Sequence, residues 1–183
     1  GQNKDGDALS AAAEIYGAGF KEISAITAGD ASHTLSTADA GIVLISAALA
    51  SGAVIKLPTA NADRVGLKYR LLYTGAMAAA SKIQLPDAGS AVFSGVVVQE
   101  RAGSSGAGVA EHATNVAILA IVPGASKKSM DLDENNETFG GAIGSDLEFV
   151  YASKTKIIVT GRVLVNLATT ALDGLTATMF TST

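Results

Sequence analysis

The sequence contains no cysteine among its 183 residues, so disulfide bonds, thiolate metal sites and a cysteine nucleophile are excluded. Tryptophan is also absent, and aromatic residues supply only 5% of the chain. The apolar 48% is therefore mostly Ala, Val, Ile and Leu, a composition that suits tight β-layers with few bulky anchors. The fold must be held together by packing alone.

Charged residues are scarce as well, at 16% of the chain against about 25% in an average globular domain. Much of the surface must consist of Ala, Ser, Thr and Gly, which suits contact with other protein. The 17 acidic and 13 basic residues give a net charge of −4, and no basic run is longer than the pair Lys127 and Lys128. We therefore expect no nucleic-acid partner.

No apolar stretch approaches the roughly 20 residues that a membrane helix needs. The longest stretches, 41–50 and 116–122, are interrupted by Gly or Ser or are much shorter. We expect neither a membrane-spanning segment nor a signal peptide, and no membrane partner. The chain length fits one ordinary domain, or a domain with an arm.

The first part of the chain differs from the rest. Residues 8–16 are rich in alanine and favour a helix, with Asp7 as the N-cap. A helix this short is marginal unless it docks on something. We therefore expect residues 1–20 to form an N-terminal arm that contacts a neighbouring subunit or another protein. The apolar side chains that this arm would present are Leu9, Ile15, Tyr16 and Phe20.

From residue 21 onward, short β-branched runs are separated by turn residues about every 8–12 positions. This rhythm predicts one all-β domain over 21–183, an antiparallel β-sandwich or barrel of jelly-roll type, and not βαβ repeats. A hairpin turn is expected at 151–155, and loops at 102–108 and 123–138. The expected strands are 21–27, 42–46, 53–57, 68–73, 82–85, 91–98, 115–122, 147–151, 156–160, 162–167 and 176–181.

A search for catalytic motifs finds no phosphate-binding glycine loop, no nucleophile elbow and no zinc-protease helix. The only histidines, His33 and His112, lie far apart and lack a Ser and Asp constellation, so we expect structural roles for both. Ser153 and Lys156 match the spacing of Ser-Lys acyl enzymes but sit at the predicted hairpin without the companion motifs. We expect no enzymatic activity, no catalytic residue and no cofactor.

One acidic stretch places oxygen donors at alternate positions, as calcium-binding loops do at their start. The donors are Asp131, Asp133, Asn135 and Glu137. Asn136 stands where an EF-hand needs Gly, and Ala142 stands where it needs a bidentate Glu. The stretch predicts a solvated polar loop and no metal site; a weak calcium or magnesium site is the alternative.

Residues 33–73 resemble a pattern found in small structural proteins of tailed phages. The matching pieces are Thr34-Leu35-Ser36, Asp39-Ala40-Gly41, the apolar run 42–45, residues 53–58 and Gly66-Leu67-Lys68-Tyr69. Residues 144–150 and 157–161 are similar to the closing hairpin of that family, with Ile157 near the position of its usual Trp. The matching positions shape turns and strands and do not form a site.

The resemblance implies a capsid decoration (cement) protein, a β-rich virion structural protein on the outer surface of a phage head. Such a protein is a homotrimer that binds the major capsid protein and bridges neighbouring capsomers. In that setting the arm would reach the shell or a neighbouring subunit. A receptor- or glycan-binding module of a phage tail fibre or spike is the alternative, which the low aromatic content disfavours.

Overall fold

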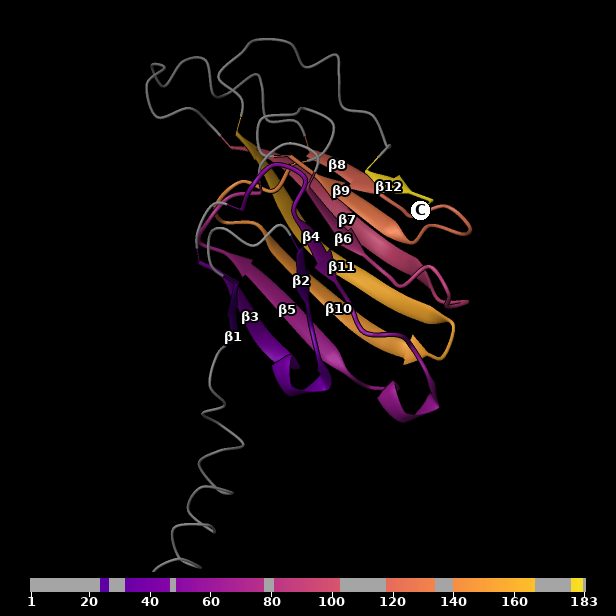
Figure 1. Ribbon diagram of the computed structural model, residues 1–183. Helices are drawn as coiled ribbons and strands as arrows, with labels where there is room; N and C mark the ends of the chain where they lie inside the picture. Colours follow the sequence, from indigo (N-terminus) through magenta and orange to yellow (C-terminus); the bar gives the residue numbers. More distant parts are fainter. Residues whose placement is uncertain are drawn as a thin grey trace, which may run out of the picture.

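The computed structural model describes residues 24–26, 32–46, 49–77, 81–102, 118–133, 140–166 and 179–182. Two β-sheets pack face to face as a sandwich, and neither closes into a barrel (Figure 1). The prediction of an all-β sandwich is therefore confirmed. The predicted arm, with Leu9, Ile15, Tyr16 and Phe20, lies outside the described residues, so its role stays a prediction.

The larger sheet has seven strands in the order β1-β3-β5-β10-β11-β7-β8, and the smaller has five in the order β12-β9-β6-β4-β2. The strands of the larger sheet are β1 (Ser24–Ile26), β3 (Gly41–Ile45), β5 (Lys68–Tyr73), β7 (Val92–Ala102), β8 (Ile118–Ile121), β10 (Asp146–Ser153) and β11 (Lys156–Asn166). Those of the smaller sheet are β2 (Ser32–Thr34), β4 (Val54–Lys56), β6 (Ser81–Gln84), β9 (Ser129–Leu132) and β12 (Phe180–Thr181). Two short 3-10 turns, η1 (Thr37–Asp39) and η2 (Ala62–Arg64), precede β3 and β5.

From β1 to β7 the chain crosses between the sheets at every step. Odd-numbered strands enter the larger sheet and even-numbered strands enter the smaller one. Each return to a sheet has the same direction, so β1, β3 and β5 pair in parallel, as do β2, β4 and β6. This half of the molecule is a two-layer coil in which each turn stacks on the one before. The hairpin of β10 and β11 then separates β5 from β7.

The expectation of antiparallel pairing was wrong for half of the strand pairs in the described residues. Five of the ten strand pairs are parallel, namely β1-β3, β3-β5, β2-β4, β4-β6 and β7-β11, and the other five are antiparallel. The alternation of apolar and polar residues indicates which side chains face the core, and the alternation is the same in parallel and antiparallel sheets. Jelly-roll connectivity is excluded with it, because that fold is built from antiparallel strands.

Two local predictions also need correction, and one strand was missed. The predicted loop 123–138 contains strand β9, whose Met130 and Leu132 are buried between the sheets. The predicted break between 156–160 and 162–167 does not occur, because Gly161 continues β11 at a φ of 130°. Strand β2 was not predicted at all. The hairpin turn expected at 151–155 is confirmed between β10 and β11.

Aliphatic and aromatic side chains from both sheets fill the space between the layers. A row of buried residues crosses the larger sheet through Val43, Leu71 and Leu147, which are register partners. Phe93 of β7 lies 5.8 Å from Phe149 and 5.9 Å from Phe180 of the smaller sheet, measured between ring centroids. These rings anchor one end of the sandwich.

Two tyrosines of the larger sheet reach across to corners of the smaller one. Tyr69 donates to the carbonyl of Ser36 at 2.8 Å, and Tyr151 donates to the carbonyl of Pro58 at 2.7 Å. Their rings lie 6.0 Å apart in a tilted arrangement. Burial raises the pKa of Tyr69 to about 12, and the nearby carboxylate of Asp39 adds to the effect. Both hydroxyls therefore stay protonated and keep donating at neutral pH.

We expect stability to fall at alkaline pH. Because an unfolded tyrosine titrates near pH 10 and Tyr69 in the fold titrates near 12, the folded chain binds this proton more tightly. The contribution is complete below about pH 10 and is lost as the pH rises towards 12. Urea unfolding across this interval, with phenolate absorbance followed in parallel, measures the loss. A Tyr69→Phe variant should show a shallower decline, and an unchanged decline would contradict the assignment.

Candidate interaction face

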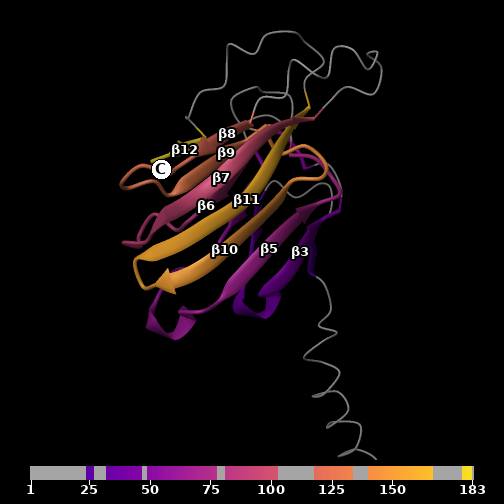
Figure 2. The same cartoon turned by 180° about the vertical axis from the view of Figure 1, so that it is seen from behind.

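The outward side of the larger sheet is open: no described strand or turn covers it (Figure 2). We call the outward side chains of β3, β5, β10, β11, β7 and β8 the outer sheet face. The exposed large aliphatic residues of the described chain are Ile42, Val65, Val96, Ile118, Val122, Ile143 and Ile158. Five of these seven lie on the outer sheet face or directly after β8. Ile118 and Val122 lie at the β8 edge of the sheet and are 62% and 66% exposed.

Strand register aligns the outward side chains into rows. Ile42 of β3 is the partner of Arg70 in β5, and Arg70 is the partner of Glu148 in β10. Glu148 pairs in turn with Thr160 of β11, which pairs with Val96 of β7. Register partners point to the same side of a sheet. The row therefore has aliphatic side chains at its two ends and polar ones in the middle.

Half-buried aliphatic side chains fill the spaces between the charges. Leu44 and Leu72 are register partners on β3 and β5, and Val150 lies beside Ile158 on β10 and β11. Val98 of β7 is partly buried as well. The outer sheet face is therefore mainly aliphatic, with charged groups at single positions. This composition resembles that of a protein interface more than that of a solvated surface.

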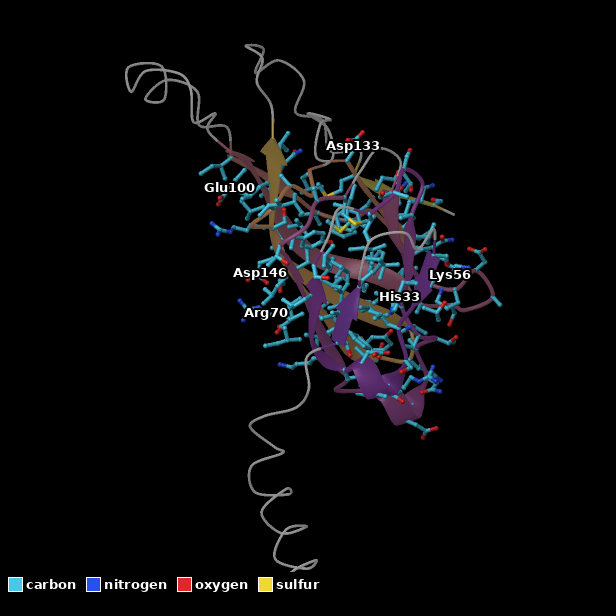
Figure 3. All side chains as sticks on the ribbon, turned by 60° about the vertical axis from the view of Figure 1, so that its left-hand side comes forward. His33, Lys56, Arg70, Glu100, Asp133 and Asp146 are labelled. Atoms are coloured by element: carbon cyan, nitrogen blue, oxygen red, sulfur yellow. The ribbon has the colours of Figure 1, made fainter. Side chains whose placement is uncertain are left out.

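A line of ion pairs crosses the middle of the face. The guanidinium group of Arg70 donates to both carboxylate oxygens of Asp146, from Nε to Oδ1 at 3.0 Å and from Nη2 to Oδ2 at 2.5 Å. This hydrogen bonding lowers the pKa of Asp146 below its ordinary value and raises the pKa of Arg70. Arg162, the register partner of Asp146, contacts Glu100 at 3.5 Å. Figure 3 shows Arg70, Asp146 and Glu100 on one side of the molecule and Lys56 on the opposite side.

Exposed ion pairs of this kind add only about 1 kcal/mol or less to folding. The ion pairs matter more for orientation than for stability, because the bidentate contact holds the side chains of Arg70 and Asp146 in one orientation. A partner with complementary charges would meet groups that are already ordered. The face is therefore suited to bind a flat protein surface in a fixed orientation.

The structure places His33 and the acidic stretch on different strands, and Ser153 and Lys156 are register partners at the hairpin of β10 and β11. His33 takes an inward-facing position on β2 as the register partner of Ile55, which agrees with a structural role. Asp131 lies on β9, where it contacts Lys82 at 3.7 Å, and Asp133 exchanges backbone hydrogen bonds with Gly140. Over the described residues no three His, Asp or Glu side chains gather to hold a metal. His112, Asn135 and Glu137 lie outside the described residues.

The outer sheet face was missed at the sequence level, although a signal for it exists. Strands 41–45, 92–98 and 156–160 carry aliphatic residues at consecutive positions, not only at alternate ones. Such runs are typical of strands buried on both faces. In this structure only one face of each strand is covered by the second sheet, so the remaining aliphatic residues are exposed.

Comparison with protein-family models, with curated proteins and with solved structures finds no match to this chain. Within the described part of the chain, no helix has the length and apolar character needed to cross a membrane.

Proposed function

We propose that this chain is a virion structural protein that decorates the outer surface of a tailed-phage capsid and stabilises it by bridging capsomers. The observation that carries the proposal is the outer sheet face, where exposed aliphatic side chains surround a line of ordered ion pairs. On this proposal the major capsid protein covers that face. The resemblance of residues 33–73 to tailed-phage structural proteins supports the same partner.

The face has the size that such a contact needs. The six strands of the outer sheet face span about 24 Å at the usual spacing, and the eight residues of β10 extend about 27 Å along it. The resulting area of about 650 Å² lies in the range of about 600–1,000 Å² for one side of a standard protein interface. A contact of this size, repeated around a shell, holds neighbouring subunits together without any chemical step.

The proposal includes a homotrimer. Strand β8 is an edge strand of the larger sheet, and Ile118 on it and Val122 directly after it are exposed. An exposed apolar edge is prone to association, and closed cyclic symmetry covers it in every copy. Sedimentation equilibrium measures the number of copies, and a stable monomer at micromolar concentration would contradict this part of the proposal.

The decisive variant is Ile158→Glu. Ile158 lies on β11 near the centre of the outer sheet face, so a carboxylate there would have to be buried unpaired against the shell. We expect co-sedimentation with phage heads stripped of their decoration protein to weaken by at least about tenfold.

The matched control is Ile143→Glu. Ile143 is 61% exposed and lies in the turn before β10, outside the strands that form the outer sheet face. It introduces the same charge change at a similar side chain, so binding to heads should be retained. Both variants should keep the circular dichroism spectrum of the parent protein. Equal loss in the two variants, or no binding by the parent chain, would overturn the proposal.

A further inference from the structure

A groove of about 610 Å³ opens on the smaller sheet, opposite the outer sheet face. It runs across the ends of three parallel strands, β2, β4 and β6, where the chain turns a corner towards the other sheet. Its size is in the range of small-molecule sites, about 300–1,000 Å³. Lys56, at the end of β4, marks this side of the molecule in Figure 3.

The three corners repeat one short motif. They read Leu35-Ser36-Thr37-Ala38, Leu57-Pro58-Thr59-Ala60 and Leu85-Pro86-Asp87-Ala88. Each leucine is 1% exposed and anchors its corner in the core. Backbone hydrogen bonds also join the corners to one another. The amide of Leu35 donates to the backbone carbonyl of Lys56, and the amide of Leu57 donates to the backbone carbonyl of Gln84, both at 2.9 Å. Repetition of the anchor therefore builds a regular groove from segments distant in the sequence.

The positions beside each anchor differ in chemistry. The residue before each leucine is Thr34, Lys56 or Gln84, and these three are register partners in a row along the groove. The residue two positions after it is Thr37, Thr59 or Asp87. The buried leucine is therefore the same in the three corners, while the side chains that line the groove differ. The groove has hydroxyl groups at one end, cations in the middle and a carboxylate at the other end.

The cations of the groove lack carboxylate partners among the described residues. The side-chain ammonium group of Lys56 forms no ion pair or hydrogen bond there, and Arg64 donates through Nη1 to the carbonyl of Thr59 at 2.6 Å. The hydroxyl groups of Thr34 and Thr37 also make no hydrogen bond to described residues. Two positive charges beside unused hydroxyl groups, in a protein with a net charge of −4, favour a ligand that carries both negative charge and hydroxyl groups.

The walls of the groove are held rigidly. The hydroxyl of Tyr69 binds the carbonyl of Ser36, and that of Tyr151 binds the carbonyl of Pro58. Ser36 also caps η1 in a reciprocal arrangement with Asp39, whose pKa is lowered by hydrogen bonds from the Ser36 backbone and side chain. A ligand would therefore meet groups that need little ordering on binding.

We propose that this groove binds a short acidic oligosaccharide of the uronic-acid class. A sugar carboxylate lies between Lys56 and Arg64, and ring hydroxyl groups bind the threonine hydroxyls and the amide oxygen of Gln84, whose Nε2 donates to Oδ1 of Asp87 at 3.3 Å. The apolar rings of Pro58 and Pro86 line the groove and cover the apolar faces of the sugar rings. The proposal is independent of capsid binding, because the groove and the outer sheet face lie on opposite sides of the molecule.

Calorimetric titration with a short oligogalacturonate tests the proposal. The same oligomer with its carboxyl groups methyl-esterified is the ligand control, because it keeps every ring and hydroxyl group but loses the charge. We expect the full chain to bind the acid form and the Lys56→Gln variant to bind it about tenfold more weakly. The ester should bind more weakly than the acid to the parent chain.

The protein control is Lys154→Gln, which makes the same charge change in the turn between β10 and β11, outside the groove. It should bind the acid form as the parent chain does. An equal loss in Lys154→Gln would mean attraction by net charge alone and would overturn the proposal. Equal binding of acid and ester, or no binding of either, would overturn it as well, whatever the result with phage heads.

Discussion

Replacing Gly161 by alanine is expected to lower the free energy of unfolding by about 3–5 kcal/mol, by combining backbone strain with a steric clash. Gly161 sits within β11 at a φ of 130°, where side chains are rarely tolerated. A Cβ there would run into the carbonyl oxygen of Asp146 on the neighbouring strand β10. Relief requires the two strands to separate at the centre of the larger sheet, next to the Arg70 and Asp146 ion pair.

Gly52→Ala is the matched control. Gly52 has a φ of 78°, but nothing lies within 4 Å of the position that its Cβ would take. Only the backbone strain applies, so we expect a loss of about 1–2 kcal/mol. Urea unfolding followed by circular dichroism measures both variants. A loss at Gly161 no larger than that at Gly52 would show that β10 and β11 do not approach as closely as described.

Truncation of Phe93 to alanine is expected to cost about 3–5 kcal/mol, the usual range for a buried phenylalanine. Phe93 is 2% exposed and contacts Phe149 within its own sheet and Phe180 from the other sheet. Its loss would open a cavity between the layers at the end where β12 closes the smaller sheet. Urea unfolding gives the change, and the leucine variant at the same position should lose much less because it keeps most of the volume.

A double-mutant cycle separates the contact between sheets from the general loss of volume. We expect Phe93→Leu and Phe180→Leu to be non-additive by about 0.5–1.5 kcal/mol, the usual worth of an aromatic pair. Phe180 lies on the last described strand, far from Phe93 in the sequence. Strict additivity would contradict the packing of β12 against β7.

Strands with a strong local pattern were predictable residue by residue. The run 68–73 alternates between charged or half-buried and fully buried positions, and β5 has the predicted limits. The hairpin of β10 and β11 was predictable for a similar reason, because β-branched runs flank a short polar turn. In these places side-chain burial on one face is enough to decide the local structure.

Strand β2 and the mixed pairing could not be predicted in this way. The segment Ser32–Thr34 has no hydrophobic run, and its backbone is extended because it pairs in parallel with β4. Pairing partners depend on which strands become neighbours across the two sheets, and that depends on the crossing of the chain between layers. A local pattern carries no information on that choice.

The candidate sites divide in the same way. Composition alone determined that the chain lacks disulfides and thiolate sites, that it favours β-structure, and that its surface is poor in charge. The repeated Leu-Ser/Pro motif of the groove was also visible in the sequence, as a self-similarity between residues 35, 57 and 85. Only the tertiary structure decided that these corners stack into one groove, and that one side of the larger sheet is left uncovered. The physical reason is that both features depend on contacts between segments far apart in the chain, whose closeness is set by the packing of the whole sandwich.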